Sequence, residues 1–175
     1  MRALVTGGNG FLGSHLVSLL TEQGHEVRVL YQEGTDHDRL AGLDPAPELV
    51  AGDLLQPPGL ALACRGCDTV FHLAGVVQDW DPAELFLRVN VGGTANLLRA
   101  AVQEGVRRLV FTSSLAVHRY VGITDGDEAW PRDNTDHPYG ASKIACEDLL
   151  LQAHAAGDIE AVVVRPGVVP FGPGD

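Results

Sequence analysis

The sequence has few cysteines and no long apolar run, and each shortage excludes a class of protein. Its three cysteines, Cys64, Cys67 and Cys146, are an odd number and do not form the even framework of a small secreted disulfide scaffold, so we expect a reducing compartment. No stretch approaches the about 18 consecutive apolar residues of a membrane-spanning helix. Glycines also occur too close to the start of the sequence to leave room for the apolar region of a signal peptide. The sequence therefore predicts a cytoplasmic protein with no membrane partner.

Basic residues are also scarce. The 175 residues include 12 Lys and Arg against 23 Asp and Glu, which gives a net charge of −11 at pH 7. A surface of this sign repels phosphate groups, so nucleic acid is not an expected partner. The composition, 45% apolar and 20% charged, is that of an ordinary globular chain and excludes disordered and fibrous proteins. We expect one domain over residues 1–175.

Short apolar runs alternate with longer segments of helical periodicity. This alternation is typical of βαβ units and of a parallel sheet buried on both faces. The predicted strands are residues 2–6, 26–30, 48–51, 69–73, 108–112 and 159–164. The predicted helices are residues 11–23, 58–65, 83–104 and 138–156. Right-handed crossovers then predict an α/β fold with a doubly wound parallel sheet, a Rossmann fold, with its strands in the order 3-2-1-4-5-6 and a ligand crevice at the carboxyl ends of strands 1 and 4.

A glycine-rich turn joins the first predicted strand to the first predicted helix. Residues 6–13 read TGGNGFLG, in which Gly7, Gly10 and Gly13 match GxxGxxG, and Gly8 begins an overlapping GxGxxG pattern. Such glycines permit a tight turn and let the backbone approach a pyrophosphate, while the N–H groups of the helix end face the phosphates. Because this run lies between a strand and a helix, it predicts a dinucleotide-binding site.

The choice between NAD and NADP stays open at the end of the second predicted strand. An acid at this position binds the ribose hydroxyls of NAD, and an arginine pairs with the 2′-phosphate of NADP. The chain has Tyr31, Gln32 and Glu33 here, so neither expected residue lies at the strand end. Glu33 could reach back for NAD and Arg39 could reach in for NADP. Alternatively, both side chains are solvated loop residues that contact neither cofactor.

Two further strand ends face the predicted crevice. Asp53 and Leu54 follow the third strand, where the carboxylate or the backbone could meet the adenine amino group; a plain strand-exit turn is the alternative. His72 ends the fourth strand and is followed by Leu73, Ala74 and Gly75, whose small members let a flat cofactor lie against the backbone. His72 itself is as compatible with a packed, hydrogen-bonded histidine as with a ligand contact.

A tyrosine, a lysine and two hydroxyls form the candidate catalytic group. Tyr139 and Lys143 lie at i and i+4, on one face of the helix that Pro138 begins. An ammonium group beside a phenol favours the phenolate, which makes Tyr139 a candidate general acid or base. Ser113 and Ser114 follow the fifth strand, where a hydroxyl can polarise a substrate oxygen.

Seven motifs occur in order along nearly the whole chain. They are TGGNGFLG at 6–13, GDL at 52–54, HLAG at 72–75, NVGGT at 90–94, SS at 113–114, YGASK at 139–143 and RPG at 165–167. Through them the chain resembles the extended short-chain dehydrogenases/reductases, the NAD-dependent epimerase/dehydratase family. It looks most like the dihydroflavonol-reductase-like and sugar-nucleotide epimerase branches, and the sequence leaves the choice between them open.

The resemblance implies a mechanism and a site. Tyr139 takes the proton of a substrate hydroxyl while the substrate carbon gives a hydride to the nicotinamide, and Lys143 lowers the pKa of the tyrosine. Ser114, 25 positions before the tyrosine, steadies the developing carbonyl. The implied cofactor-binding residues are Gly7, Gly10, Phe11, Leu12, Gly13, Asp53, Leu54, Leu73, Ala74, Gly75, Asn90, Tyr139 and Lys143. The implied partner is a small-molecule substrate, a nucleotide sugar or a small ketone. Asn90 matches an orienting asparagine of the family, and it could equally be a plain helix residue.

The match also departs from the family pattern. Family members continue into a C-terminal substrate domain, and residues 165–175 resemble the segment that crosses into it, RPxxVxGPGD, with one residue extra. We therefore expect the N-terminal part of a longer protein or a shortened gene product. The alternatives to an active enzyme are a dinucleotide-binding module without turnover and a fold with a decayed site. A sheet without its covering domain exposes apolar surface, which predicts self-association into a homo-oligomer.

The residue pattern predicts no metal site. Cys64 and Cys67 have the CxxC spacing, but no second pair follows, and they lie at the end of a predicted helix, which favours small packed side chains over redox or metal chemistry. Residues 122–138 contain five acids without the spacing of a calcium-binding loop. We expect this segment, like residues 34–47, to be a surface loop.

Overall fold

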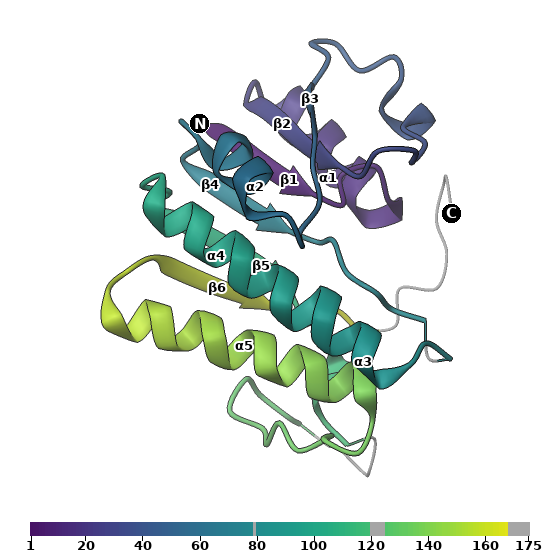
Figure 1. The fold of residues 1–175 in the computed structure, drawn as a ribbon, viewed down its shortest axis with the longest axis vertical. Coiled ribbons are helices and arrows are strands. Elements are labelled where there is room, and N and C mark those ends of the chain that lie inside the picture. The colour runs from purple at the N-terminus through teal and green to yellow at the C-terminus, as the bar shows by residue number, and fades with distance from the viewer. Residues whose placement is uncertain (79, 120–124, 168–175) are drawn as a thin grey trace.

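The computed structural model of the chain describes residues 1–78, 80–119 and 125–167 (Figure 1). Six strands form one sheet: β1 (Arg2–Thr6), β2 (Glu26–Tyr31), β3 (Glu48–Ala51), β4 (Thr69–His72), β5 (Arg108–Thr112) and β6 (Glu160–Val164). The helices are α1 (Phe11–Glu22), α2 (Pro57–Cys64), α3 (Ala83–Phe86), α4 (Gly93–Gln103) and α5 (Pro138–Ala156), with the 3-10 turns η1 (Asp38–Leu40) and η3 (Leu115–Val117) and the π-helix η2 (Leu87–Gly92).

The strand order is β3-β2-β1-β4-β5-β6 and all strands run parallel, which confirms the predicted Rossmann fold. Thr6 at the end of β1 is opposite His72 of β4, and His72 is in turn opposite Phe111 of β5. The carboxyl ends of these strands therefore meet at one edge of the sheet, on both sides of the point where the strand order reverses. This edge is where ligands bind in doubly wound sheets.

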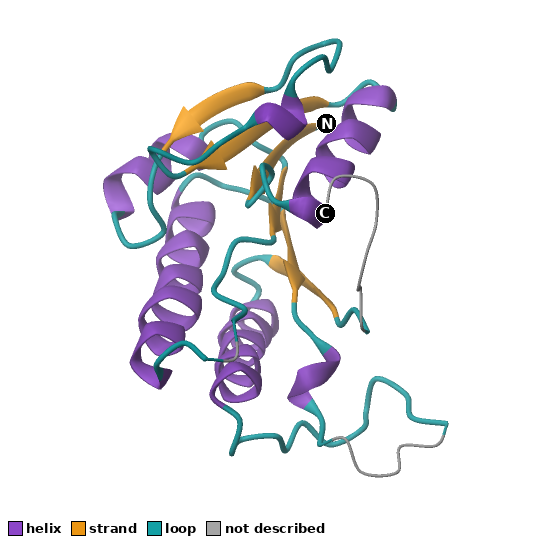
Figure 2. Cartoon of the chain, turned by 90° about the vertical axis from the view of Figure 1, so that its right-hand side faces the viewer, coloured by secondary structure: helices purple, strands orange, loops and turns teal. Residues whose placement is uncertain are grey.

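Helices cover the two faces of the sheet with two separate apolar clusters (Figures 1 and 2). Leu4 of β1 points into the larger cluster, which also receives Leu60 of α2, Leu97 of α4 and Leu150 of α5. The neighbouring residues of β1 point to the opposite face, where α1 contributes Val17. Successive side chains of a strand alternate between faces, so a strand buried on both sides reads as the continuous apolar run on which the prediction rested.

Element boundaries differ from the predictions by one residue in most cases. The larger difference concerns residues 83–104, which were predicted as one helix and consist of α3, the π-helix η2 and α4. The prediction of an uninterrupted α-helix was wrong in its middle turn. Apolar spacing over two or three turns does not distinguish a single π turn from an α turn.

The C-terminal edge of the sheet is β6, which pairs with β5. Val162 and Val164 of this strand are 38% and 46% exposed. Of the predicted loop over 122–138, residues 122–124 lie outside the described residues, as do residues 168–175 of the segment that resembles RPxxVxGPGD. In the described parts of the chain, no helix is long and apolar enough to cross a membrane.

Candidate active site

The glycine-rich turn connects β1 to α1 through close backbone contacts. Gly7 has a φ of +70°, and the Gly10 N–H donates to the Gly7 carbonyl at 3.0 Å. A Cβ atom on Gly13 would lie 2.0 Å from the Gly7 oxygen, so only glycine fits at this position. Gly10 is the N-cap of α1 and provides no side-chain cap. The first N–H groups of the helix are therefore available to an anion such as a pyrophosphate.

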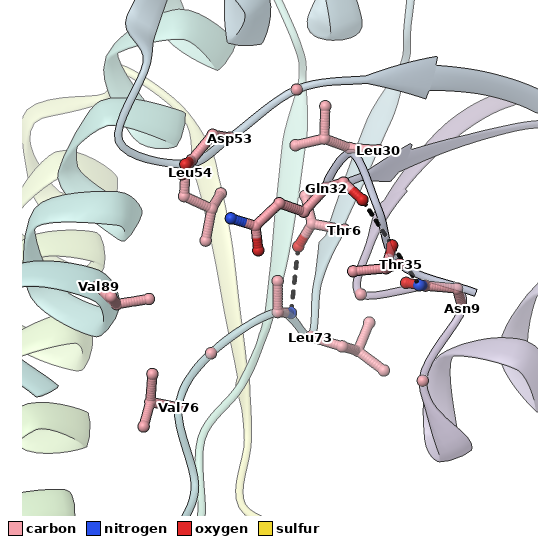
Figure 3. A pocket seen from close by; sticks show the side chains of 15 residues that line it. Thr6, Asn9, Leu30, Gln32, Thr35, Asp53, Leu54, Leu73, Val76 and Val89 are labelled. Atoms are coloured by element: carbon pink, nitrogen blue, oxygen red, sulfur yellow. Dashed lines mark hydrogen bonds between the residues drawn. The ribbon is translucent and has the colours of Figure 1, made fainter. Parts of the chain in front are cut away.

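A cleft of about 400 Å³ opens above the carboxyl ends of the first strands (Figure 3). Seven of the residues predicted to bind the cofactor line it, namely Gly7, Gly10, Asp53, Leu54, Leu73, Ala74 and Gly75. Asp53 forms the strand-exit turn considered as one alternative, and a contact with the adenine amino group stays a prediction. It lines the cleft, and its Oδ1 accepts a hydrogen bond from the Leu55 N–H at 2.8 Å, which closes a strand-exit turn.

A second cleft of about 400 Å³ continues from the glycine turn to the candidate catalytic residues. Phe11, Leu12 and Gly13 line it on the side of the glycine turn, and Leu73 and Gly75 line both clefts. Its other wall is formed by Ser113, Ser114, Tyr139, Lys143, Pro166 and Gly167. The structure therefore brings the predicted dinucleotide turn and the predicted proton-transfer residues to one continuous hollow.

Lys143 is 4% exposed and is held in place by three contacts. Its Nζ donates to the Thr112 carbonyl at 2.9 Å and lies 4.8 Å from the ring centre of Phe111 and 5.7 Å from that of Tyr139. Burial lowers the pKa of Lys143 from 10.5 to about 8. The amine thus remains largely protonated at neutral pH and lies beside the phenol, as the i and i+4 spacing predicted.

The start of α5 positions Tyr139 against the segment that follows β5. A Cβ atom on Gly140 would lie 2.5 Å from the Ala116 carbonyl oxygen, so helix and loop approach more closely than any side chain allows. Ser114 caps η3, and its Oγ accepts from the Ala116 N–H at 3.1 Å. Ser113 lies deeper, at 3% exposure, and its hydroxyl donates to Glu147. Within residues 1–78, 80–119 and 125–167, the Ser113 hydroxyl proton has a protein acceptor and that of Ser114 has none.

Asn90 lies behind the wall of the first cleft. It is 3% exposed, its Oδ1 accepts from the Val76 N–H at 2.8 Å, and its Nδ2 donates to the Val76 carbonyl at 3.0 Å. Nδ2 also approaches the Ser142 Oγ at 3.1 Å. This geometry gives Asn90 an orienting function, since it fixes Val76, which lines the cleft, from the π-helix.

Comparison with known proteins identifies the family of the chain. The model of the NAD dependent epimerase/dehydratase family matches residues 3–175. The chain belongs to this family. The resemblance recognised from the seven motifs is thus confirmed, and the family is one that depends on NAD.

Relatives of this family member include both reductases and sugar-nucleotide enzymes. A 3 beta-hydroxysteroid dehydrogenase/Delta 5-->4-isomerase of Mycobacterium tuberculosis is 36% identical over 99% of this chain and 48% of its own length. A 2-alkyl-3-oxoalkanoate reductase of Stenotrophomonas maltophilia is 34% identical over 100% of the chain and 52% of its own length. The structure of a Thermus thermophilus UDP-glucose 4-epimerase in complex with NAD superposes with a TM-score of 0.82, at 34% identity over 94% of this chain and 54% of the other. The chain spans about half the length of the curated relatives it matches.

Several residues that line the first cleft were not among the predicted cofactor-binding residues, and Gln32, Asn9 and Thr35 are three of them. Gln32 follows β2 and points into the cleft toward Asp53 and Leu54 (Figure 3). Asn9 donates to the Thr35 hydroxyl at 3.1 Å, and that hydroxyl donates to the Gln32 carbonyl at 2.6 Å. The signal was the position of Gln32 immediately after the strand, but the search there was for an acid or an arginine.

Glu33 and Arg39, the two residues considered for choosing the cofactor, differ in their positions. Glu33 lines a neighbouring hollow together with Gln32 and Asp53. Arg39 belongs to η1 and is exposed, and among the described residues it is not part of the lining of either hollow. The site is therefore neutral or acidic near the end of β2.

His72 is a packed residue in the epimerase/dehydratase fold. It is buried, its Nδ1 lies 2.7 Å from the Thr6 hydroxyl, and its Nε2 lies 2.9 Å from the Thr94 hydroxyl. Burial, with a smaller effect of the nearby Lys143 charge, lowers the pKa of His72 from 6.5 to about 3. The ring is consequently neutral at physiological pH and links β1, β4 and α4.

The cysteines are buried thiols. Cys64 closes α2, Cys67 precedes β4, and burial raises the pKa of Cys64 to about 12. Such a thiol stays protonated, which disfavours redox chemistry at this pair. Across residues 1–78, 80–119 and 125–167, no group of three or more His, Cys, Asp or Glu side chains is placed to hold a metal ion.

Proposed function

We propose that the chain forms the dinucleotide-binding and proton-transferring part of an NAD-dependent oxidoreductase or epimerase. Its substrate carries a hydroxyl or a carbonyl group, as in a nucleotide sugar or a small ketone. The observation that carries the proposal is the second cleft, which joins the glycine turn to Ser114, Tyr139 and Lys143. Relatives named as a hydroxysteroid dehydrogenase, an oxoalkanoate reductase and a UDP-glucose epimerase support this class of substrate.

The residues present fit the cofactor. Gly7 and Gly13 leave a backbone cradle that a Cβ atom would fill, and α1 presents its N-terminus to it. When bound, NAD supplies the acceptor for a hydride from the substrate carbon. The Tyr139 hydroxyl oxygen takes the proton of the substrate hydroxyl in oxidation and returns it in reduction. The buried Lys143 ammonium stabilises the phenolate, and the Ser114 hydroxyl donates to the substrate oxygen as its charge develops.

The end of β2 supports NAD rather than NADP as the cofactor of this chain. Gln32 offers an amide to the ribose hydroxyls, and the nearby acids Asp53 and Glu33 would repel a 2′-phosphate. Among the described residues, neither hollow at this end is lined by Lys or Arg. A phosphate placed there would lose its hydration without gaining a cationic partner.

Parallel calorimetric titrations with NAD and with NADP test the binding part. We expect saturable binding of NAD and binding of NADP that is at least about tenfold weaker. Equal affinities would overturn the selectivity, and binding of neither would overturn the dinucleotide site and favour a decayed fold.

Tyr139→Phe tests the catalytic part in an assay of NADH formation against nucleotide sugars, hydroxysteroids and small alcohols. Loss of turnover with NAD affinity retained supports Tyr139 as the acid/base. The matched control is Tyr31→Phe, which removes a phenol from the end of β2 that contacts His37. A wild-type chain that binds NAD and turns over no substrate would favour the alternative, a binding module without turnover.

A further inference from the structure

Glu147 of α5 is a charged side chain that the proposed proton transfer does not use. It is 0% exposed and lies one turn after Lys143 and two turns after Tyr139, on the same side of the helix. Its Oε1 accepts from the Ser113 hydroxyl at 2.5 Å and from Arg165 Nε at 2.9 Å. Its Oε2 accepts from Arg165 Nη2 at 2.8 Å and from Arg132 Nη1 at 3.1 Å. Both carboxylate oxygens are thus fully used.

The partners of Glu147 come from separate segments that form the second cleft. Ser113 begins the segment after β5 and precedes Ser114, while Arg165 follows β6 and precedes Pro166 and Gly167. The two segments are also joined directly, because the Ser113 N–H donates to the Val164 carbonyl at 2.8 Å and the Leu115 N–H donates to the Pro166 carbonyl at 3.0 Å. The carboxylate therefore ties both strand-exit segments to the helix that carries Tyr139.

Arg132 and Arg165 connect the network to the segment that precedes α5. Arg132 pairs with Asp148 at 2.8 Å as well as with Glu147, and Arg165 Nη1 donates to the Glu128 carbonyl at 3.2 Å. The segments that follow β5 and β6 and the segment that precedes α5 are thereby held at one buried point.

The charge on Glu147 is maintained by its protein partners in place of water. Burial alone would raise the pKa of Glu147, but hydrogen bonds from Arg165 and Ser113 and the charges of Arg165 and Arg132 hold it below its ordinary value. The carboxylate is therefore ionised inside the protein. Buried ion pairs of this kind are often no more stabilising than apolar residues of similar volume, whereas they fix geometry through directed hydrogen bonds.

We propose that Glu147 is a positioning residue that holds Ser114 and the Pro166–Gly167 wall in register with Tyr139, acting through Ser113 and Arg165 without touching the substrate. The inference rests on the proposed function, because the register matters only if Ser114 and Tyr139 act on one substrate oxygen. Small displacements of such groups cost rate steeply.

Two variants test this function in different ways. Ser113→Ala removes one hydrogen bond and leaves the Glu147–arginine pairs in place, so it preserves the fold. Glu147→Gln removes the charge and turns an amide N–H toward arginine donors. The matched control is Arg28→Met, which removes another buried charge away from the second cleft. The Arg28 side chain pairs with Glu48 and donates to a carbonyl at the end of α2.

Kinetics on the substrate found in the turnover assay give the first measurement, together with NAD titration and thermal unfolding. We expect both variants to lower kcat by about tenfold or more while KM and NAD affinity change by less than about twofold. Arg28→Met is expected to lose thermal stability and keep its kcat. A wild-type kcat in Ser113→Ala and in folded Glu147→Gln would overturn the inference.

Amide hydrogen exchange gives a measurement that does not need turnover. In Ser113→Ala we expect exchange within residues 113–118 to accelerate by about tenfold, while the glycine turn at 7–13 exchanges as in the wild type. Unchanged exchange at 113–118 would overturn the inference even if the chain proves inactive. If the chain fails to bind NAD but Ser113→Ala accelerates exchange at 113–118, the proposed function is overturned. The positioning of these segments by Glu147 remains supported in that case.

Discussion

The half of the sheet formed by β1, β2 and β3 differs from the half formed by β4, β5 and β6 in what faces the ligand. The first half presents backbone, since Gly7, Gly10 and Gly13 form its cradle and α1 contributes N–H groups. The second half presents side chains, with Tyr139 and Lys143 projecting from α5. In the proposed function, binding of the pyrophosphate therefore depends on the absence of side chains at the glycine turn, whereas proton transfer depends on polar side chains in defined positions.

This difference has an energetic consequence. Close backbone packing around glycines stabilises fold and site together, because the same contacts serve both. A buried ammonium on α5 is useful for chemistry and costs free energy of folding, since it loses hydration. We therefore expect substitutions in the first half to damage binding and stability together, and those in the second half to separate activity from stability.

Gly13→Ala is the substitution with the largest expected effect. The added Cβ would lie 2.0 Å from the Gly7 oxygen, so the turn must open and the pyrophosphate cradle is lost. We expect NAD affinity to fall by about 100-fold or more in calorimetry, together with a lower melting temperature. The matched control is Gly92→Ala, whose Cβ would have its nearest neighbour at 3.8 Å. A Gly13→Ala variant that binds NAD with wild-type affinity would contradict the expectation that binding depends on close backbone packing at this turn.

Lys143→Met tests whether activity and stability separate on α5. The folded pKa of Lys143 is about 8 against 10.5 ordinarily, so at pH 7 the fold carries a buried charge whose cost is about 1.4 kcal/mol per pKa unit, or about 3 kcal/mol. Loss of the hydrogen bond to Thr112 offsets part of the gain. We expect the variant to be inactive and more stable by about 1 to 2 kcal/mol in urea unfolding at pH 7.

The pH dependence of that gain provides the check. Between pH 8 and pH 10.5 the unfolded chain keeps a proton on Lys143 that the folded chain has lost, so wild-type stability rises through this window. The methionine variant lacks this rise, and its advantage should disappear by pH 10.5. An inactive variant that is less stable than the wild type at every pH would contradict the separation.

His72 predicts a loss of stability in acid. Its folded pKa of about 3 lies below the ordinary 6.5, so the stability it contributes is present above pH 6.5 and is lost as pH falls toward 3. Between pH 6.5 and pH 5 the loss is expected to be about 2 kcal/mol in the wild type. His72→Asn should flatten this slope in urea unfolding, and the exposed His15→Asn accounts for the general effect of removing an imidazole. Equal slopes in wild type and His72→Asn would contradict the burial of a neutral ring.

Gln32→Arg has the smallest expected effect and sharpens the comparison on the binding side. A guanidinium at the end of β2 would pair with a 2′-phosphate near the point where Gln32 enters the cleft. We expect the ratio of NADP to NAD affinity to rise by about tenfold, measured by parallel titration. Gln56→Arg, from the neighbouring hollow, controls for the added charge. An unchanged ratio would mean that Gln32 does not face the ribose.

Much of the fold was predictable because it depends on local pattern. The strands at 2–6, 48–51 and 108–112 match the structure residue for residue. For β1 this follows because an apolar run marks a strand buried on both faces. β3 is an edge strand that is largely exposed. The glycine turn between β1 and α1 was predictable because the spacing of the glycines indicates where the backbone packs too closely for a side chain. The spacing of Tyr139 and Lys143 likewise fixes their common helix face.

The polar network of the second half was not predictable. Ser113 lies 34 positions before Glu147, and Arg165 lies 18 positions after it, so no periodicity connects them. A glutamate on a helix is ordinarily a surface residue, and nothing local signals that this one is buried. The π-helix around Asn90 escaped prediction for a similar reason, because its bonds to Val76 join distant segments.

The contact between Gly140 and the Ala116 carbonyl has a consequence for how such a site can diversify. The backbone sets the separation between the start of α5 and the loop that holds Ser114, because no side chain fits between them. A change of side chain therefore cannot adjust this separation in small steps. New substrates have to be accommodated by changes in the residues that border the second cleft. The separation between the start of α5 and the loop that holds Ser114 stays the same.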